Sequence, residues 1–155
     1  MTEAHPVTVT WVAPADPAAA PLLAALRVEY DERYGDGEGE LAAYPPSDFT
    51  PPAGGLVVLQ LAGTTVAGGA FRRHDAATAE LKRIWTAASH RRHGLGRRVL
   101  AELEAEIARR GYRRIRLTTG PRQPEAIGLY RATGYVVLPD DPGPWKLHHF
   151  GKQLP

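Results

Sequence analysis

The sequence predicts a mixed α/β domain, and three observations carry this prediction. Short runs of alternating apolar and polar residues, rich in Val, Ile and Thr, predict β-strands along much of the chain. Apolar residues spaced about four apart predict an amphipathic helix over residues 95–110. Its stripe consists of Leu95, Val99, Leu100, Leu103 and Ile107. Glycines and prolines separate the segments at intervals typical of turns.

The predicted elements alternate as strand, helix, three strands, helix, strand, helix and two strands. The predicted strands cover residues 7–12, 56–61, 66–73, 78–86, 113–119, 135–138 and 145–150. The predicted helices cover residues 17–34, 95–110 and 124–133.

Turn and capping chemistry sets several of these boundaries. Asp16 followed by Pro17 is typical of a helix start, because an N-cap carboxylate accepts from the first turn and proline suits the first helical position. The segment Ala62-Gly63-Thr64-Thr65 predicts a hairpin turn. Glycines are expected to end helical segments at positions 35, 37, 39 and 111. A proline-rich loop is expected over residues 45–55.

Composition narrows the class of protein. The 155 residues, of 16.8 kDa, suffice for one domain, which we expect to span residues 1–155. The chain has no cysteine, which excludes disulfides, thiolate zinc sites and cysteine nucleophiles. Its apolar runs are too short to cross a bilayer, and residues 1–6 lack the order of a signal peptide. We therefore expect a soluble cytoplasmic protein with no membrane partner.

A net charge of +2 hides a strong asymmetry along the chain. Residues 1–50 contain two arginines and nine acidic residues, whereas residues 91–131 contain eleven arginines and four acidic residues. A basic segment of this kind indicates an anionic partner, either a nucleic acid or a phosphorylated small molecule. Tyr112, Tyr130 and Tyr135 are too few aromatics for an evident base-stacking surface, so no nucleic-acid partner is expected.

The most informative segment is Arg91-Arg92-His93-Gly94-Leu95-Gly96-Arg97-Arg98, between a predicted strand and a predicted helix. Two glycines at a helix start let a ligand approach the backbone, and the unpaired amides of the first helical turn favour a phosphate. The segment is not a Walker loop, and position 99 is Val where a dinucleotide fingerprint needs Gly. Taken alone, these residues also fit a structural turn with solvated arginines.

Two motifs together resemble the GCN5-related N-acetyltransferase (GNAT) family. The run Arg91-x-x-Gly94-x-Gly96 is similar to the family's Gln/Arg-x-x-Gly-x-Gly/Ala signature, which lies between its fourth strand and third helix. The segment 123–135 resembles its Asn-x-x-Ala-x-x-Leu-Tyr-x-x-x-Gly-Phe/Tyr segment, with Gln123 in place of Asn. The resemblance covers roughly residues 55–152, and segments within this range are similar to bacterial members of the family.

This resemblance implies a mixed, mostly antiparallel twisted sheet, splayed between its fourth and fifth strands and flanked by about four helices. It implies acetyl-CoA in the splay, with the pyrophosphate on the glycine turn and the pantetheine arm along the fourth strand, and no metal. The cofactor-binding residues that it implies are Ile84, Trp85, Thr86, Arg91, Arg92, His93, Gly94, Leu95, Gly96, Arg97, Gln123 and Tyr130.

Transfer from a thioester to an amine requires a proton acceptor for the amine and a proton donor for the departing thiolate. Tyr130 occupies the family position that faces the sulfur, which implies a general acid; the other interpretation is a ring packed against the sheet. Glu80 in the predicted fourth strand is the candidate base, and a solvent-facing residue paired with Arg72 or Lys82 is the alternative. Weaker candidates for the base are His74 and His90.

The acceptor is expected to be a primary amine on a small molecule or a peptide. In the family, the first helices, the loop after them and the final strands build the acceptor pocket. In this chain the first helices and the loop after them are rich in acidic and aromatic residues, which favours a cationic amine as the acceptor. Acidic residues on the solvent-facing surface of a helix would give the same pattern. The residues concerned are Glu29, Tyr30, Asp31, Glu32, Tyr34, Asp36, Glu38, Glu40, Tyr44, Asp48 and Phe49.

A non-catalytic acyl-CoA-binding protein is the alternative function. Such a protein would keep the glycine turn without needing Tyr130 or Glu80, so their joint presence favours an N-acetyltransferase. Because the chain has no cysteine, the acetyl group is expected to pass directly to the amine in a ternary complex. The resemblance also implies a possible homodimer, since many relatives pair through edge strands or the C-terminal region.

Overall fold

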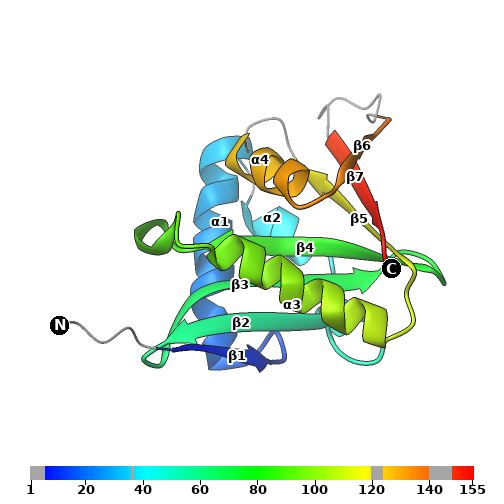
Figure 1. The fold of residues 1–155 in the computed structure, drawn as a ribbon. Helices are drawn as coiled ribbons and strands as arrows, with labels where there is room; N and C mark the ends of the chain where they lie inside the picture. Colours follow the sequence, from blue (N-terminus) through cyan, green and yellow to red (C-terminus); the bar gives the residue numbers. More distant parts are fainter. Residues whose placement is uncertain (1–5, 36, 120–123, 140–147) are drawn as a thin grey trace.

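The protein is built on one mixed β-sheet with helices on both faces (Figure 1). The computed structural model describes residues 6–35, 37–119, 124–139 and 148–155. The strands are β1 (Val7–Trp11), β2 (Gly55–Leu61), β3 (Thr64–Arg73), β4 (Thr78–Thr86), β5 (Arg114–Thr119), β6 (Val136–Leu138) and β7 (His148–Gln153). The α-helices are α1 (Ala20–Tyr34), α2 (Gly37–Ala42), α3 (Leu95–Arg109) and α4 (Pro124–Ala132).

Sheet order departs from chain order only at the last two strands. The order is β1-β2-β3-β4-β5-β7-β6, and every neighbouring pair is antiparallel except β4 and β5, which are parallel. The predicted mostly antiparallel mixed sheet is confirmed.

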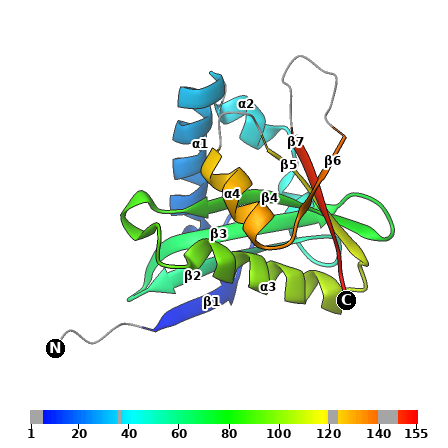
Figure 2. The same cartoon turned by 45° about the horizontal axis from the view of Figure 1, so that its top comes forward.

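Helices α3 and α1 cover opposite faces of the sheet, as the two views in Figures 1 and 2 agree. Strand β2 explains why both faces are covered, because its apolar run buries side chains alternately on each side. Val57 and Leu59 join the cluster that contains α3, whereas Leu56 and Val58 join the cluster under α1 and the 3₁₀ turn η1 (Pro17–Ala19) that precedes it. The sheet is therefore a buried central layer, and the core lies on both sides of it.

Helix α3 forms where the four-residue spacing predicts it. The five residues of the predicted stripe are all buried against the sheet. Gly111, with a φ of 90°, follows the helix in the left-handed region that glycine adopts without strain. This packing fixes the helix start, and with it the glycine turn that leads into α3.

The N-terminal half differs from the predicted elements in two places. Asp16 caps a 3₁₀ turn, η1 (Pro17–Ala19), through its Oδ1, which accepts from the Ala18 amide at 2.8 Å, and α1 begins only after that turn. A short helix, α2, forms where glycines were expected to prevent one. It lies against α1, and tertiary contact of this kind overrides weak helix propensity.

Two further boundaries differ from the predicted ones for reasons of hydrogen bonding. Ala62 and Gly63 both have positive φ, at 50° and 82°, which makes a two-residue hairpin turn, so that β3 begins at Thr64 and not at residue 66. At the other end, β7 continues to Gln153 because that residue still pairs with Arg114 of β5. The predicted start of this strand, residues 145–147, lies outside the described residues.

The predicted splay between the fourth and fifth strands is confirmed. Strands β4 and β5 pair over only four positions, the last being Leu81 with Leu117. Beyond that pair, β3 is the one described strand to which β4 remains hydrogen-bonded. Strand β4 has a bulge in this stretch, because Ala70 pairs with Lys82 whereas Gly68 pairs with Trp85. Two residues of β4 therefore oppose Gly69. The separation leaves backbone groups of β4 facing away from β3 without a strand partner among the described residues.

Candidate active site

The turn before α3 has the backbone geometry of an anion site. Strand β4 ends at Thr86, the 3₁₀ turn η3 (Ala88–His90) follows, and α3 begins at Leu95. Gly94 caps the helix with a φ of 79°, and Arg92 also has positive φ, at 67°. The first amides of α3 have no partner within the helix, and the helix dipole places partial positive charge at this end.

A cleft of roughly 600 Å³ opens between this turn, the end of β4, α1 and α4. It brings together nine of the predicted cofactor-binding residues: Ile84, Trp85, Thr86, Arg91, Arg92, Gly94, Leu95, Gly96 and Arg97. Of the other three, His93 is exposed outside the lining, Tyr130 is buried next to the lining residue Leu129, and Gln123 lies outside the described residues. The cleft is thus formed by segments that are far apart in the sequence.

Three residues of the cleft were not predicted as site residues, namely Arg33, Ala126 and Leu129, whereas Glu29 was expected in the acceptor pocket. Glu29 and Arg33 are one turn apart on α1 and form an ion pair at 3.0 Å. Ala126 and Leu129 belong to the segment that resembles the family motif, so a signal for them was present. For Arg33 the sequence held no such signal, because its place in the cleft depends on how α1 packs.

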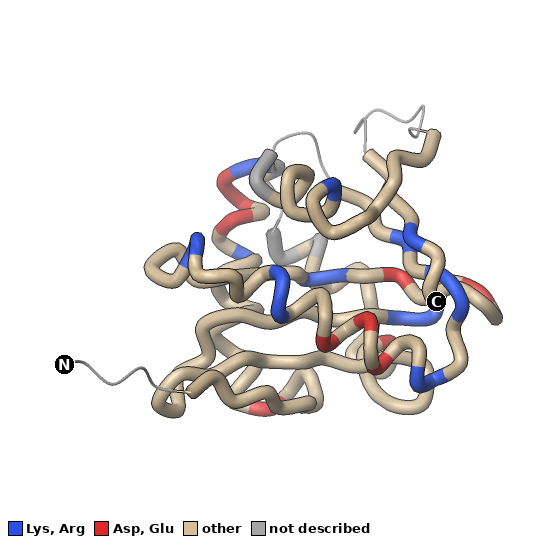
Figure 3. Tube along the Cα trace, viewed as in Figure 1, with Lys and Arg blue, Asp and Glu red and all other residues tan. Residues whose placement is uncertain are grey.

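The cleft is mainly cationic. Its lining contains Arg33, Arg91, Arg92 and Arg97 against the single carboxylate of Glu29, and the three arginines around the turn are exposed. Figure 3 shows basic positions on the loop that leads into α3 and at the start of that helix. Guanidinium groups beside open backbone amides suit a phosphorylated ligand.

Tyr130 lies in α4, at the border between this cleft and the core. It is 5% exposed, and its ring packs against those of Tyr135 and Phe150, with centroids 5.8 Å and 6.0 Å away. Burial, with a smaller contribution from Tyr30, raises the pKa of the Tyr130 phenol above its usual value. The phenol is therefore protonated throughout the neutral pH range.

Polar contacts at the C-terminal end of α4 tie this wall of the cleft to α3. Lys152 of β7 donates to Glu104 of α3 at 3.0 Å and to the carbonyl of Thr133 at 2.9 Å. Tyr135 donates to the same Glu104 carboxylate at 2.9 Å. One acidic residue on α3 thus holds both the strand and the segment that follow the helix carrying Tyr130.

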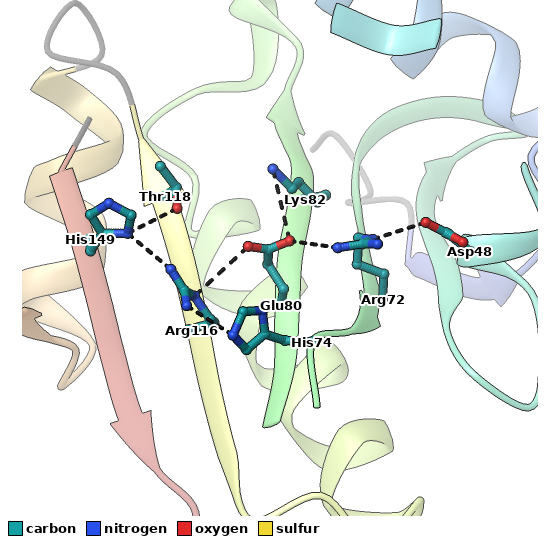
Figure 4. A network of polar contacts seen from close by, with 8 residues as sticks. All are labelled: Asp48, Arg72, His74, Glu80, Lys82, Arg116, Thr118 and His149. Carbon is teal, nitrogen blue, oxygen red and sulfur yellow. Dashed lines mark hydrogen bonds and ion pairs between the residues drawn. The ribbon is translucent and has the colours of Figure 1, made fainter. Parts of the chain in front are cut away.

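Glu80 lies outside the described cleft and is buried, not solvent-facing as the alternative interpretation supposed. Its side chain belongs to a polar network on the face of the sheet away from α3 (Figure 4). Arg72 donates to its Oε1 at 3.2 Å, and Lys82 lies 4.0 Å from the same oxygen. Arg116 of β5 lies 3.8 Å from Oε2. The predicted pairing with Arg72 and Lys82 is confirmed, and Arg116 adds a third cation.

The histidines considered as bases have other contacts. His74 and His149 both contact the guanidinium of Arg116, each at 3.0 Å. His90 contacts the hydroxyl of the neighbouring Ser89 at 2.8 Å. Within the described residues, no group of three or more His, Asp or Glu side chains could hold a metal ion, and no helix is long and apolar enough to cross a membrane.

The acidic and aromatic residues proposed for the acceptor region are dispersed. Phe49 is fully buried in the core cluster with Leu56 and Val58, so it does not line an acceptor mouth as expected. Asp48 pairs with Arg72 at 3.0 Å. Asp31 and Glu32 are exposed on α1. Asp36 and the side chains of Tyr34, Glu38 and Glu40 lie outside the described residues.

Comparison with known proteins identifies the family to which this fold belongs. Residues 20–135 match the family model described as Acetyltransferase (GNAT) family. The fold matches a candidate acyl-CoA N-acyltransferase from Klebsiella pneumoniae with a TM-score of 0.77 and 30% identity, over 96% of this chain and 97% of that one. A GNAT acetyltransferase from Elizabethkingia anophelis, solved with acetyl-CoA bound, gives a TM-score of 0.74 at 17% identity over 96% and 98%.

A curated relative is also similar in sequence. YsnE of Bacillus subtilis, an N-acetyltransferase that is itself uncharacterized, is 41% identical over 76 residues, which are 47% of this chain. The match spans about half the length of that relative, 50%. The fold of this chain is that of the acyl-CoA N-acyltransferases. The chain belongs to the GNAT family of acetyltransferases.

The left-handed geometry at Gly94 generates a stability prediction. A Cβ at Gly94 would meet no atom within 4 Å, so the cost of Gly94→Ala comes from the positive φ alone. We expect a loss of about 1 kcal/mol in the free energy of unfolding, measured by urea titration. Gly128 of α4 is the matched control, because a Cβ there also meets nothing within 4 Å and its φ is not in the left-handed region. Gly128→Ala should raise the free energy of unfolding by up to about 1 kcal/mol. If the two variants changed the free energy of unfolding equally, the left-handed conformation of Gly94 would be contradicted.

Proposed function

We propose that the protein transfers an acetyl group from acetyl-CoA directly to a primary amine. The observation that carries this proposal is the cleft that joins the open helix start and arginines before α3 to the separated end of β4. Membership of the GNAT family supports acetyl-CoA as the donor. One domain is proposed to perform the whole reaction.

The residues around the turn are proposed to hold the phosphates of the donor. Backbone amides from Arg92 to Arg97 would donate to the pyrophosphate, with His93 and the exposed arginines nearby. The edge of β4 from Ile84 to Thr86 would pair with the amide groups of the pantetheine arm. Along this stretch alternate backbone groups of β4 point away from β3 at a place where β5 has already separated, which is what strand-like pairing with a ligand requires. Gln123 keeps its predicted role as a cofactor contact.

The chemical step needs two proton transfers. The neutral amine attacks the thioester carbonyl carbon, the carbonyl becomes an oxyanion, and the carbon–sulfur bond then breaks. Tyr130 is proposed to give its proton to the departing thiolate, because its phenol is protonated at neutral pH and lies beside the cleft residue Leu129. Glu80 is proposed to accept the amine proton, through a water molecule. With no cysteine in the chain, the acetyl group moves without an acyl-cysteine intermediate.

The phosphate-binding role of the turn is tested by charge reversal. Arg97→Glu places a carboxylate where the proposal puts the pyrophosphate, so acetyl-CoA should bind about 10- to 100-fold more weakly in calorimetry. Arg109→Glu is the control, because Arg109 lies at the far end of the same helix and its side chain is 70% exposed. Equal affinities for the Arg97 variant and the unmodified protein would remove the pyrophosphate site from this turn.

The general-acid role is tested by removing one hydroxyl. Tyr130→Phe should lower kcat by about a hundredfold or more while acetyl-CoA affinity stays within about twofold. Tyr135→Phe is the matched control, because its ring packs against Tyr130 while its hydroxyl contacts Glu104. Thiol release measured over a panel of amines gives kcat, and unchanged turnover in the Tyr130 variant would refute the acid role. Tight acetyl-CoA binding with no turnover by the unmodified protein would favour a non-catalytic acyl-CoA-binding protein.

The base role is tested through the pH dependence. Glu80→Gln removes the proton acceptor, so kcat/KM should fall by about a hundredfold near neutral pH and recover as rising pH deprotonates the amine in solution. Asp48→Asn is the control, because it removes the other carboxylate bound to Arg72 and leaves Glu80 in place. A pH–rate profile of the Glu80 variant with an unaltered shape would show that another group takes the proton.

A further inference from the structure

The polar network around Glu80 carries more positive than negative charge. Its charged members among the described residues are the cations of Arg72, Lys82 and Arg116 and the carboxylates of Asp48 and Glu80 (Figure 4). The side chains of the three cations are only 17–27% exposed. Because partly buried charge is weakly screened, one positive charge in excess favours an anionic group nearby.

The excess positive charge lies where strands β4 and β5 separate. Leu81 and Leu117 are the last paired residues of β4 and β5, and the next residue on each strand is Lys82 and Thr118. Thr118 pairs across with His149 of β7. Side chains alternate along strands, so Lys82 shares the face of Glu80. Figure 4 shows Lys82 and Thr118 beyond Glu80, on the two sides of this opening.

Lys82 is the cation with the least compensation in the network. Arg72 hydrogen-bonds to a carboxylate at both ends, at 3.0 Å to Asp48 and 3.2 Å to Glu80. The ammonium of Lys82 reaches Glu80 only at 4.0 Å, and it lies over the ring of Tyr44 at 4.6 Å from the centroid. Its N–H groups make no hydrogen bond to a described residue, so they can donate to a ligand.

Of the two histidines of the network, His149 has its Nδ1 engaged within the network itself. A guanidinium only donates, so the Nδ1 of His149, which lies 3.0 Å from Arg116, must accept. The proton of the neutral ring is then on Nε2. Thr118 approaches the same Nδ1 at 3.3 Å, and its hydroxyl proton is used in that contact. His149 therefore has no free acceptor at Nδ1 to offer an ammonium group, and the donor beside the opening is the ammonium of Lys82, which suits an anion.

The other acidic residues that favoured a cationic acceptor do not remove this excess. Asp48 is already counted in the balance through its pair with Arg72. Glu29 is paired with Arg33 on α1 and lines the cleft, outside the network.

We infer that the acceptor amine carries a carboxylate, bound at the opening between β4 and β5 by the ammonium of Lys82. This inference rests on the proposed acetyltransferase function and names its substrate class: amino acids or short peptides, in which a carboxylate and an amine belong to one molecule. The carboxylate fixes the acceptor so that its amine lies near Glu80.

The test compares each acceptor with its own carboxamide. L-amino acids, dipeptides and the carboxamide of each are assayed for acetylation by thiol release and mass spectrometry. A carboxylate raises the pKa of the nearby amine, so at neutral pH the carboxamide has more neutral amine, and a preference for the acid must come from binding. We expect kcat/KM to be at least about tenfold higher for the acid than for its amide, about 1.4 kcal/mol of discrimination. The dipeptide arm distinguishes a peptide from a free amino acid.

Three variants assign the preference to Lys82. Lys82→Met should reduce the acid-to-amide ratio to within about threefold, mainly through KM for the acid, and Lys82→Arg should restore most of it. Arg109→Gln removes one cation from the far end of α3 and should leave the ratio unchanged. Thermal unfolding of each variant establishes that it is folded, so that the comparison is between folded proteins.

The outcomes separate this inference from the proposed function. Acetylation of amines with no preference for the acid, or a preference that survives Lys82→Met, overturns the carboxylate site and leaves the acetyltransferase function standing. If no amine is acetylated, the proposed function fails, and calorimetry on the CoA-saturated protein decides the anion site. If calorimetry then detects binding of a carboxylate and Lys82→Met abolishes this binding, the anion site is supported. If no such binding is detected, the anion site is overturned.

Discussion

The early end of the β4–β5 pairing is the constraint on which the rest of the structure depends. Four parallel pairs hold the two strands together, and after Leu81 and Leu117 the ladder stops. Unpaired strand edges are normally a liability in a folded protein. Here one edge faces a cleft, so the lost backbone hydrogen bonds become places where a ligand with amide groups of its own can bind.

The same separation gives two unlike environments along β4. At its open end, arginines, the start of α3 and residues of α1 and α4 surround the cleft, which suits an anionic ligand. On the side of α1, a network of alternating charges surrounds Glu80. Both faces of β4 are used, because a residue and its neighbour point to opposite sides of a strand. A single strand thus reaches both proposed substrates.

The bulge in β4 adjusts this strand at the same place. Gly69 of β3 faces two residues of β4, and a Cβ at that glycine would lie 2.6 Å from the Cδ1 of Ile84. Arg83, with a φ of 60°, carries the unusual backbone geometry of the bulge. Its guanidinium donates to the Leu41 carbonyl at 3.0 Å, which ties the bulge to α2.

The sequence alone predicts the features that depend on local pattern. Helix α3 followed from its spacing, and the glycine turn from its residues and their likeness to a family motif. The bulge at Arg83 could not be predicted, because it depends on register against β3. The position of Glu29 and Arg33 beside the cleft depends on how α1 lies relative to α4. The contact of Arg116 with Glu80 likewise needed the register of β5, whereas Arg72 and Lys82 lie on the hairpin of Glu80 itself.

The order of the last two strands determines how the wall of the cleft that carries Tyr130 is joined to the sheet. Strand β6 is made before β7 but lies outside it, and among the described strands it pairs only with β7. Lys152, which joins that wall to Glu104, is itself a residue of β7. Among the described strands, the segment from α4 to β6 therefore reaches the rest of the sheet only through β7, so this wall of the cleft depends on the pairing of β7 with β5.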